Sequence, residues 1–420
     1  MEHTLAQAVE IVTTALTVAG MGYFLAAMVA AQVFLRARRT RLQAFTPAVS
    51  VFKPLKGIDT GMMDAFRSHC RQTYPGKYEL LFGVSSPDDP AADAVEQLKA
   101  EFPDLPIQLI ETPQRLGTNG KVSTLIQLYP HAQYDFLLIN DSDITVSPRY
   151  LERVMAGFVS GHDFSRANQA NEIKGALAPE ENSLQRLGTK PVGLVTALYR
   201  GRAHGTLASK FESLGLSTDF QPSILLSKLL EGGLHYGLGS TLAVRREALE
   251  KIGGLETLVD HLADDYELGV RIDRAGYSVA LSTEVVETSV PAYNWSGFIE
   301  HQLRWARTVR DARPGGYIGL VFTYGLCWAL LNVLASGLSP LSLWLLSMSF
   351  FLRLALAMQA GTAVLGDHQV LPNLWLLPLR DLVQMGLWIA GFAGNTIIWR
   401  GERFVVLGGK LQKPGEPSSR

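Results

Sequence analysis

The sequence predicts an α/β protein with a mostly parallel sheet, with transmembrane helices added near both ends of the chain. Two observations lead to this fold class. Short apolar segments alternate with helix-like segments between residues 42 and 313, which is the pattern of a parallel sheet covered by helices. Apolar stretches without charged residues flank this region, and they are long enough to cross a bilayer.

The first predicted transmembrane helix comprises residues 11–35. This stretch carries no charged residue, and about 20 apolar residues suffice to cross a bilayer. It is too long for the apolar part of a signal peptide, and its length and flanks favour a membrane span over a buried helix of a soluble domain. Because basic flanks stay in the cytoplasm, the arginines that follow place the N-terminus outside and the next region in the cytoplasm. These arginines are Arg36, Arg38, Arg39 and Arg41.

The cytoplasmic domain is expected to span residues 42–313. Parallel sheets bind ligands at the carboxyl ends of their strands, so the polar residues that follow each strand are expected to share one site. The predicted strands are residues 49–55, 78–86, 107–112 and 134–141, and the predicted helices between them are residues 61–72, 91–101 and 119–129. The polar residues at the strand ends are Lys53, Asp88, Asp89, Asp141 and Asp143.

Two segments of this domain fall outside the alternating pattern. Residues 161–190 are polar, which predicts a surface segment inserted into the domain. Residues 205–238 are amphipathic, and they form either a helix on the membrane surface or a helix of the domain core.

The C-terminal membrane region is expected to span residues 314–400 and to hold two or three helices. Residues 314–352 lack charged side chains and contain a turn sequence at 337–340, which predicts two helices joined by a tight turn. The four arginines that precede this stretch mark its cytoplasmic side. The shorter apolar stretch 382–399 has basic groups near both ends, so it either spans the membrane or enters and returns. Residues 401–420 are expected to be a polar tail.

The composition gives no reason to expect nucleic-acid binding. The chain has 38 Lys and Arg residues against 39 Asp and Glu residues, which leaves a net charge of -1 at pH 7. The two cysteines, Cys70 and Cys327, lie far apart in the chain. They predict neither a disulfide framework nor a cysteine metal site, which fits a reducing compartment.

Two carboxylates follow the last predicted strand in the segment LLINDSDI. At strand spacing Asp141 and Asp143 point to the same side, and carboxylates this close repel each other unless a cation lies beside them. Oxygen ligands of this kind suit Mg²⁺ or Mn²⁺, which bind through one or two carboxylates together with substrate phosphates. The segment therefore predicts a metal site for a nucleotide diphosphate. A simple turn is the alternative, because Asp and Ser are favoured in turns.

Two further groups of residues suggest chemistry. Asp264 and Asp265 precede a helical segment, where they either complement the helix dipole or supply a general base that deprotonates an alcohol. Arg304 and Trp305 stand just before the C-terminal membrane region. Arginine binds phosphate oxygens with a forked donor, and tryptophan offers a flat face to a sugar or lipid, although both residue types also anchor membrane edges.

These sites, in this order and beside these membrane segments, resemble the ceramide glucosyltransferase family of inverting glycosyltransferases (glycosyltransferase family 21). The resemblance is greatest to the bacterial branch, which includes the hopanoid-associated glycosyltransferases, and it covers nearly the whole chain. It implies a GT-A type nucleotide-sugar-binding domain. The motifs that carry it are SVFKPLKGID (50–59), QTYPGKYELLFGVSSPDDPA (72–91), NDSDI, GGLETLVDHLADDYELG and HQLRWARTVR.

The resemblance implies a role for each matching residue. Asp89 matches the first acidic motif, which contacts the uridine of the nucleotide. Asp141 and Asp143 match the second acidic motif, with Asp143 the more direct metal ligand, and Asp265 matches the third, the catalytic base. The remaining matches are Arg304 and Trp305, at the end of the (Q/R)xxRW motif near the diphosphate and the acceptor, and Lys53 and Lys121, at basic positions near the nucleotide.

The chain departs from the family's pattern at three places. His301 stands where the motif has Gln or Arg, with Gln302 beside it, which leaves the role of His301 open. The eukaryotic members carry Gly at the position of Asp143, so this chain keeps a fuller metal site. The segment 161–190 is longer than the family's usual link.

The resemblance implies a membrane-bound inverting transferase that moves a hexose from UDP-glucose or UDP-N-acetylglucosamine to a lipid hydroxyl and forms a β-glycoside. The implied acceptor is ceramide or a hopanoid polyol, and the implied cofactor is Mg²⁺ or Mn²⁺. We expect an integral protein of the bacterial inner membrane with its catalytic domain in the cytoplasm. The alternatives are a processive polysaccharide synthase of the same superfamily, disfavoured by the few membrane segments, and a non-enzymatic membrane scaffold, disfavoured by the intact acidic set. The sequence leaves the donor hexose, the acceptor lipid and the oligomeric state open.

Overall fold

The computed structural model describes residues 2–40, 42–159, 190–399 and 401–413. The predicted insert 161–190 therefore lies outside the described residues, except for Lys190. The chain divides into two compact units. The sheet unit comprises Ala37–Tyr199 and Ser227–Ser289, and the helical unit comprises Met1–Arg36, Arg200–Leu226 and Val290–Arg420.

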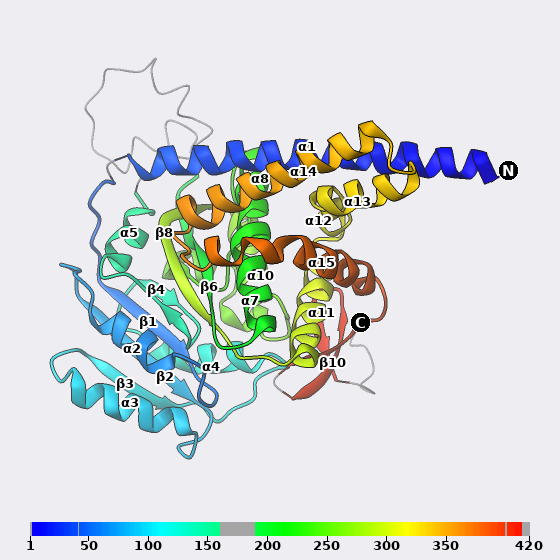
Figure 1. Cartoon of the computed structure of the whole chain (residues 1–420). Helices are drawn as coiled ribbons and strands as arrows, with labels where there is room; N and C mark the ends of the chain where they lie inside the picture. The colour runs from blue at the N-terminus through cyan, green and yellow to red at the C-terminus, as the bar shows by residue number, and fades with distance from the viewer. Residues whose placement is uncertain (1, 41, 160–189, 400, 414–420) are drawn as a thin grey trace. The chain divides into compact units, whose positions relative to one another are not determined.

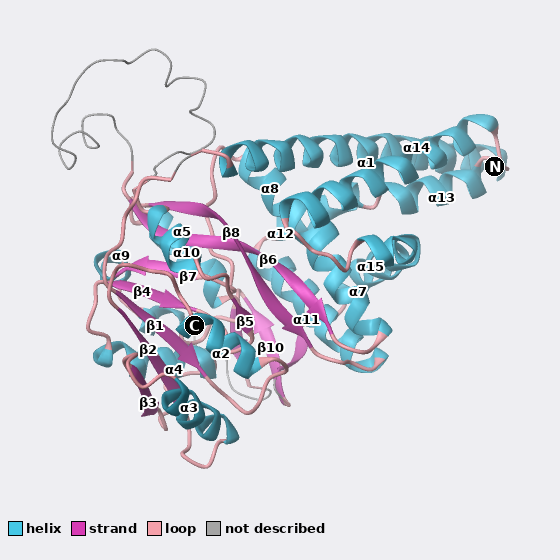
Figure 2. Cartoon of the chain, turned by 60° about the vertical axis from the view of Figure 1, so that its left-hand side comes forward, coloured by secondary structure: helices cyan, strands magenta, loops and turns pink. Residues whose placement is uncertain are grey.

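The predicted strands and helices of the sheet unit are present, with ends that differ by a few residues. Strands β1 to β4 alternate with helices α2 to α4, and the four strands lie side by side in parallel register in the order β3-β2-β1-β4 (Figures 1 and 2). The strands are β1 Val49–Pro54, β2 Tyr78–Val84, β3 Ile107–Glu111 and β4 Phe136–Ile139, and the helices are α2 Met62–Cys70, α3 Pro90–Glu101 and α4 Gly120–Leu128.

Antiparallel strands extend this parallel half to an eight-stranded sheet in the order β3-β2-β1-β4-β7-β6-β8-β5. Strand β7 pairs antiparallel with both β4 and β6, and β5 pairs antiparallel with β8. The predicted α/β class is confirmed, and the antiparallel strands are additions that the prediction did not contain. These strands are β5 Ile144–Thr145, β6 Val192–Ala203, β7 Leu242–Arg245 and β8 Ser278–Val290.

The burial of β1 and β2 explains why the sequence pattern predicts these strands. In β1 and β2 nearly every residue is buried, as expected for strands covered on both faces, so each strand reads as an almost continuous apolar run. The helices beside them begin with side-chain caps. Asp89 accepts the backbone N–H of Ala91 at the start of α3, and Asn119 accepts that of Val122 at the start of α4.

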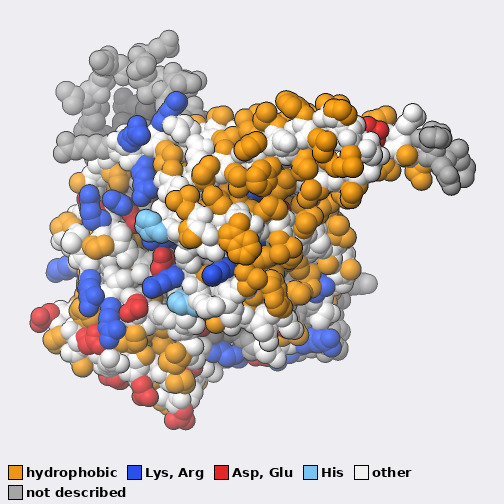
Figure 3. Space-filling view, viewed as in Figure 1, with side chains coloured by type: hydrophobic (Ala, Val, Ile, Leu, Met, Phe, Trp, Pro, Cys, Tyr) orange, Lys and Arg blue, Asp and Glu red, His pale blue; other side chains and the backbone are white. Residues whose placement is uncertain are grey.

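The helical unit contains the candidate membrane spans. Two segments are long and apolar enough to cross a bilayer, Leu5–Arg38 and Pro340–Val364, and a pair of helices bent by 56° forms a third candidate. This pair is Pro314–Thr323 and Gly325–Ala335, so two or three candidate spans are present among the described residues. Figure 3 shows apolar side chains gathered over these helices, and Leu334, Trp344 and Phe351 are among the exposed ones.

Helix α1 (Glu2–Arg38) packs tightly against α13 (Gly325–Ala335) through small residues. A Cβ atom added to Gly20 would lie 2.3 Å from the Cα atom of Gly325, so the two backbones are in contact only because both residues are glycine. Asn332 adds hydrogen bonds from its side-chain amide to Thr13 Oγ1 and Thr14 Oγ1 on α1. The N-terminal helix is thereby attached to the C-terminal membrane region.

The turn between α13 and α14 (Pro340–Ala357) lies where the sequence predicts it. Gly337 and Leu338 have positive φ angles of 62° and 64°, and Pro340 begins α14. The only charged residue within α14 is Arg353, which is buried and bonded to two carboxylates. It lies 2.7 Å from Asp381 and 2.6 Å from Asp219, as expected for a charge inside an apolar helix bundle.

The last part of the chain differs from the prediction. The apolar stretch 382–399 is not one continuous helix, because α15 (Leu377–Gly391) ends before β9 (Thr396–Trp399) begins. Residues expected in a polar tail form β10 (Glu402–Leu407) and β11 (Lys410–Gln412), which complete a three-stranded antiparallel sheet. The glycine pair between β10 and β11 has positive φ angles at both residues, which is the two-residue hairpin turn that fits twisted strands.

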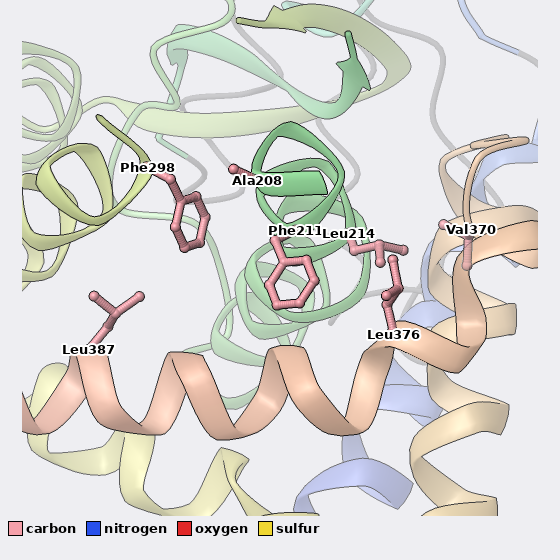
Figure 4. Packing of buried hydrophobic residues seen from close by; sticks show 7 residues of the cluster. All are labelled: Ala208, Phe211, Leu214, Phe298, Val370, Leu376 and Leu387. Atoms are coloured by element: carbon pink, nitrogen blue, oxygen red, sulfur yellow. The ribbon is translucent and has the colours of Figure 1, made fainter. Parts of the chain in front are cut away.

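Residues 205–238 are largely a core element, which was one of the two alternatives for this segment. Helix α7 (Leu207–Gly215) is buried over most of its length, a π-helical turn (Leu216–Phe220) follows it, and α8 (Gln221–Leu230) continues the chain. Figure 4 shows α7 packed against α15 and near Phe298 of α11 (Trp295–Ala312). The residues of this core cluster are Ala208, Phe211, Leu214, Phe298, Val370, Leu376 and Leu387.

Candidate active site

The two carboxylates of the NDSD segment lie in a turn directly after β4. The strand ends at Ile139, so the argument from strand spacing does not apply to Asp141 and Asp143. Their side chains have different partners: Asp141 pairs with a lysine, whereas Asp143 accepts a 2.5 Å hydrogen bond from Thr288 of β8. The turn alternative is correct for the backbone, and the Asp141 carboxylate is close enough to act electrostatically on Asp143.

Asp143 lies in an environment that disfavours its charge. Burial raises the pKa of its carboxyl to about 6, and the neighbouring Asp141 carboxylate adds to the rise. The hydrogen bond from Thr288 opposes this shift without cancelling it. A cation near these two residues would relieve the repulsion between them.

Lys53 is hydrogen-bonded to the same turn. Its side chain is fully buried at the end of β1, and its Nζ donates a 2.9 Å hydrogen bond to the backbone oxygen of Asp141. Burial lowers the pKa of Lys53 to about 7, although the Asp143 and Asp141 carboxylates pull it in the opposite direction. The prediction that β1 and β4 bring their polar ends together is therefore met by a direct bond.

Lys121, at the start of α4, connects the Asp141 turn to the Asp264–Asp265 pair. Its Nζ lies 2.8 Å from Asp141 Oδ1 and 3.6 Å from Asp264 Oδ2. Burial alone would lower the pKa of Lys121, but the two carboxylates outweigh it and raise that pKa above its ordinary value. Asn119 completes this arrangement, because its amide donates to the backbone oxygen of His261 and to Asp264.

Asp265 is the second residue of α10 (Asp264–Arg274) and lies partly buried beside Lys121 and Asp141. Burial and the adjacent Asp264 carboxylate raise the pKa of Asp265, and Lys121 opposes the rise. Its Oδ2 lies over Gly239, where an added Cβ would come within 2.9 Å. A carboxyl with a raised pKa is suited to taking a proton from an alcohol near neutral pH.

Asp89 occupies a different position from the other predicted acids. It caps α3, and both of its carboxylate oxygens lie 3.0 Å from the backbone nitrogen of Gly57. This bond holds the loop after β1, and Asp59 in the same loop is hydrogen-bonded to Ser142. Asp89 is thus joined to the NDSD turn through this loop and not by a direct contact.

Arg304 and Trp305 belong to the helical unit, where they lie on α11. The Trp305 ring lies 5.6 Å from that of Phe220 and 5.6 Å from that of His301. Two other arginines of this helix bind backbone oxygens of the C-terminal segment: Arg307 binds those of Thr396 and Ala393, and Arg310 binds those of Gly391 and Gly394.

The sheet unit thus contains one ionic cluster of predicted site residues, Lys53, Lys121, Asp141, Asp143 and Asp265. Asp89 is joined to it only through the loop after β1, and Asp88 is exposed and lies outside it. Within residues 2–40, 42–159, 190–399 and 401–413, no group of three or more His, Cys, Asp or Glu side chains has the arrangement of a metal site. Two carboxylates with substrate phosphates would need no third protein acid. Sequence reasoning missed Asn119, Thr288 and Asp59, whose contacts depend on long-range packing and leave no local pattern.

The family model for glycosyl transferase family 21 matches residues 12–164 and 181–412. The chain belongs to family 21. Ceramide glucosyltransferase 3 of Caenorhabditis elegans is 23% identical over 386 residues, which cover 88% of this chain and 75% of that protein. Ceramide glucosyltransferase 1 of the same organism is 23% identical over 376 residues, which cover 87% and 73%.

The fold of this family 21 member is similar to that of a solved structure. The mannosyltransferase PcManGT from Pyrobaculum calidifontis, in complex with GDP-Man and Mn²⁺, aligns with a TM-score of 0.51 and 21% sequence identity. The alignment covers 91% of this chain and 97% of that chain. The predicted GT-A type fold and the predicted family are confirmed. This family 21 protein is a ceramide glucosyltransferase-like glycosyltransferase with candidate membrane-spanning helices.

Proposed function

We propose that the chain transfers a hexose from a UDP-sugar, UDP-glucose or UDP-N-acetylglucosamine, to a hydroxyl of a membrane lipid with inversion to a β-glycoside. The observation that carries the proposal is the position of Lys121 between Asp141 and Asp264, beside Asp265. This arrangement joins a candidate phosphate-binding cluster to a carboxyl with a raised pKa. The names of the C. elegans relatives support glucose as the sugar and ceramide as the acceptor.

The donor end of the site is assigned to the sheet unit. Asp89 contacts the uridine, and Lys53 and Lys121 lie near the nucleotide. The basic groups suit a diphosphate because they supply positive charge where the leaving group becomes more negative. The Mn²⁺ and GDP-Man in the PcManGT complex support a nucleotide diphosphate sugar and a divalent ion for this chain.

Asp141 and Asp143 fit an oxygen-binding divalent cation, Mg²⁺ or Mn²⁺. The two carboxylates are adjacent, both offer oxygen ligands, and the pKa of Asp143 is raised to about 6 by burial and by Asp141. When bound there, the ion would neutralise charge on the diphosphate. Asp143 is the more direct ligand of the ion. The Asp141 carboxylate is neutralised by Lys121, with which it forms an ion pair.

Asp265 is the general base. The acceptor hydroxyl gives its proton to the Asp265 carboxylate as its oxygen forms a bond to the anomeric carbon. The bond between that carbon and the phosphate oxygen breaks, and its electron pair leaves with UDP. A single displacement inverts the anomeric centre, so an α-linked donor yields a β-linked product. Arg304 assists the diphosphate with its forked donor, and Trp305 presents its ring to the acceptor.

The acceptor is a lipid whose hydroxyl lies near the membrane surface, with ceramide preferred and a hopanoid polyol as the second choice. The long apolar helices and the basic residues that flank them support an inner-membrane protein with its catalytic residues on the cytoplasmic side. One hexose is added per lipid, since two or three candidate spans leave little room for a polymer channel.

The test is lipid mass spectrometry of bacterial cells with and without the gene, grown with and without added ceramide. We expect a lipid that is one hexose heavier only in cells that carry the gene. A ladder of longer glycans would support a processive synthase instead. Unchanged lipids together with an absence of UDP release from membranes would support the scaffold alternative.

A further inference from the structure

The turn after β4, which carries both candidate metal ligands, begins with Asn140, whose side chain is fully buried. The amide nitrogen Nδ2 of Asn140 donates to the backbone oxygen of Ser240 at 2.7 Å and to the hydroxyl of Tyr150 at 2.8 Å. The amide oxygen Oδ1 lies 3.3 Å from Nε2 of His69. Both polar atoms of this side chain therefore have partners inside the protein.

Three elements supply these partners. His69 lies in the last turn of α2, Tyr150 is the first residue of α5 (Tyr150–Ala156), and Ser240 precedes β7. The His69 and Tyr150 side chains are buried, and their rings lie edge to face at 5.9 Å. The Tyr150 hydroxyl also bonds the hydroxyl of Thr241 at 3.0 Å. Asn140 is thus held by three parts of the sheet unit that are far apart in sequence.

The direction of each hydrogen bond follows from the partners. The Ser240 carbonyl only accepts, so Nδ2 of Asn140 faces it and Oδ1 faces His69. Burial lowers the pKa of His69 to about 3, so its ring is neutral and carries a single N–H. Nδ1 faces the Ala65 carbonyl, which already accepts a 2.6 Å hydrogen bond from Ser68 Oγ. Oδ1 of Asn140 has no other donor among the described residues, which assigns the N–H to Nε2 of His69.

The remaining three residues of the turn are anchored as well, by the bonds to Lys53, Asp59 and Thr288. These anchors oppose a repulsion, because the Asp141 carboxylate acts electrostatically on the buried Asp143. Ligands that are fixed in advance bind an ion without the cost of ordering them first. Groups that orient metal ligands from behind typically change metal affinity by about 10-fold to 100-fold.

We propose that Asn140 and His69 are positioning residues of the metal site: the imidazole orients the Asn140 amide, and the amide fixes the turn in which Asp141 and Asp143 bind Mg²⁺ or Mn²⁺. The inference rests on the proposed function and extends it to the residues behind the ligands. Asn140 and His69 act through the turn, because their polar atoms already face protein groups. A network that only stabilised the core would leave the metal affinity unchanged.

The test is Mn²⁺ binding to the full chain in detergent, with UDP present, measured from the electron paramagnetic resonance signal of the free ion. His69→Met keeps an apolar side chain in the site and removes the donor to Asn140. We expect the dissociation constant for Mn²⁺ to rise about tenfold. His69→Gln supplies an amide N–H to the same oxygen, and we expect it to recover most of the loss.

Tyr150→Phe is a second, milder variant, which keeps the ring and removes only the hydroxyl. One hydrogen bond to Asn140 is lost, so we expect the dissociation constant for Mn²⁺ to rise about threefold. Ser50→Ala is the matched control. Ser50 is also fully buried and donates a 2.7 Å hydrogen bond to Glu79, but it is not bonded to the turn after β4. This control should lower the melting temperature and keep the wild-type Mn²⁺ affinity.

The outcomes separate the inference from the proposed transfer. Weaker Mn²⁺ binding in His69→Met or Tyr150→Phe, without a loss in Ser50→Ala, supports the inference even if the wild type transfers no sugar, in which case the proposed transfer alone fails. Wild-type affinity in whichever of the two variants folds would overturn the inference and leave the proposed function standing. An equal loss in Ser50→Ala would overturn it too, because the effect would then follow stability. Failure of the wild type to bind Mn²⁺ would overturn both the inference and the proposed metal site.

Discussion

The Lys121 ammonium lies 2.8 Å from the Asp141 carboxylate. It also pairs with Asp264, more than a hundred residues later in the chain, so Lys121 connects the turn after β4 to the start of α10. We predict that Lys121→Met raises the KM for the UDP-sugar about tenfold and lowers the melting temperature by a few degrees. The variant leaves Asp141 and Asp264 without their shared cation. Because the Asp141 side chain is 44% exposed, water compensates for only part of the lost ion pair.

The matched control for this prediction is Lys99→Met. Lys99 pairs with Glu96 at a similar distance, 2.9 Å, but both side chains are exposed on α3. Exposed pairs contribute little, so the melting temperature and the kinetic constants should stay close to the wild type. Equal effects of the two substitutions, measured by thermal unfolding and steady-state kinetics, would show that Lys121 has no special role.

Asp265→Asn should abolish transfer and preserve donor binding. The amide keeps the size of the side chain and cannot take a proton, so we expect the turnover rate to fall by about 10² to 10⁴. The dissociation constant for UDP-glucose, measured by calorimetry, should change less than threefold. Asp273→Asn, at the other end of α10, is the control and should retain full turnover. Normal turnover in Asp265→Asn would remove the base assignment.

The pH dependence of turnover should follow the carboxyl of Asp265. Burial and Asp264 raise the pKa of this carboxyl, so it stays protonated to a higher pH than an ordinary aspartate, whose pKa is about 3.9. Only the deprotonated form accepts a proton, so the rate should rise with pH through the weakly acidic range and level off above it. A rate at saturating substrates that is constant down to pH 4.5 would contradict this assignment.

Metal removal should stop transfer. EDTA treatment followed by gel filtration is expected to reduce the rate at least a hundredfold, and Mg²⁺ or Mn²⁺ should restore it. Asp143→Asn should need much more metal for the same rate, because it loses the more direct of two carboxylate ligands. Asp93→Asn, at an exposed acid in the first turn of α3, serves as the control and should show the wild-type metal dependence. Full activity in EDTA would exclude the ion.

Packing of the N-terminal helix gives a prediction about stability. Gly20→Ala places a methyl group where the α13 backbone lies, 2.3 Å from Gly325 Cα, so we expect a lower melting temperature and a lower yield in detergent. Gly22→Ala on the same helix has no atom within 4 Å of the added group and should be neutral or slightly stabilising. Comparing the two variants separates the effect of the contact between α1 and α13 from the effect of helix propensity. Thermal unfolding in detergent measures the melting temperature of each variant.

The sequence predicted the elements whose pattern is local. Strands β1 and β2 read as apolar runs because nearly all of their residues are buried, and the helices α3 and α4 start at the capping residues Asp89 and Asn119. The span at α1 and the turn at Gly337 were readable for the same reason, since length, charge and turn chemistry are local properties.

The rest depends on contacts between distant residues. In the antiparallel half of the sheet, neighbouring strands come from distant parts of the sequence. Strand β7, for example, lies between β4 and β6. The C-terminal hairpin was missed because its polar ends resemble a tail, although its glycine turn is a local signal that was available. In the candidate site, the carboxylates and lysines were identified from motifs, whereas Thr288 and Asp59 contribute through pairings that no spacing reveals.

The most direct test of the account is transfer of labelled glucose from UDP-glucose to ceramide by the purified full chain. With Mg²⁺ or Mn²⁺ present, we predict a single lipid product with one hexose, and its anomeric proton coupling should identify a β-linkage. Formation of an α-glycoside, or no lipid product from either UDP-glucose or UDP-N-acetylglucosamine while both substrates bind, would contradict the proposed reaction.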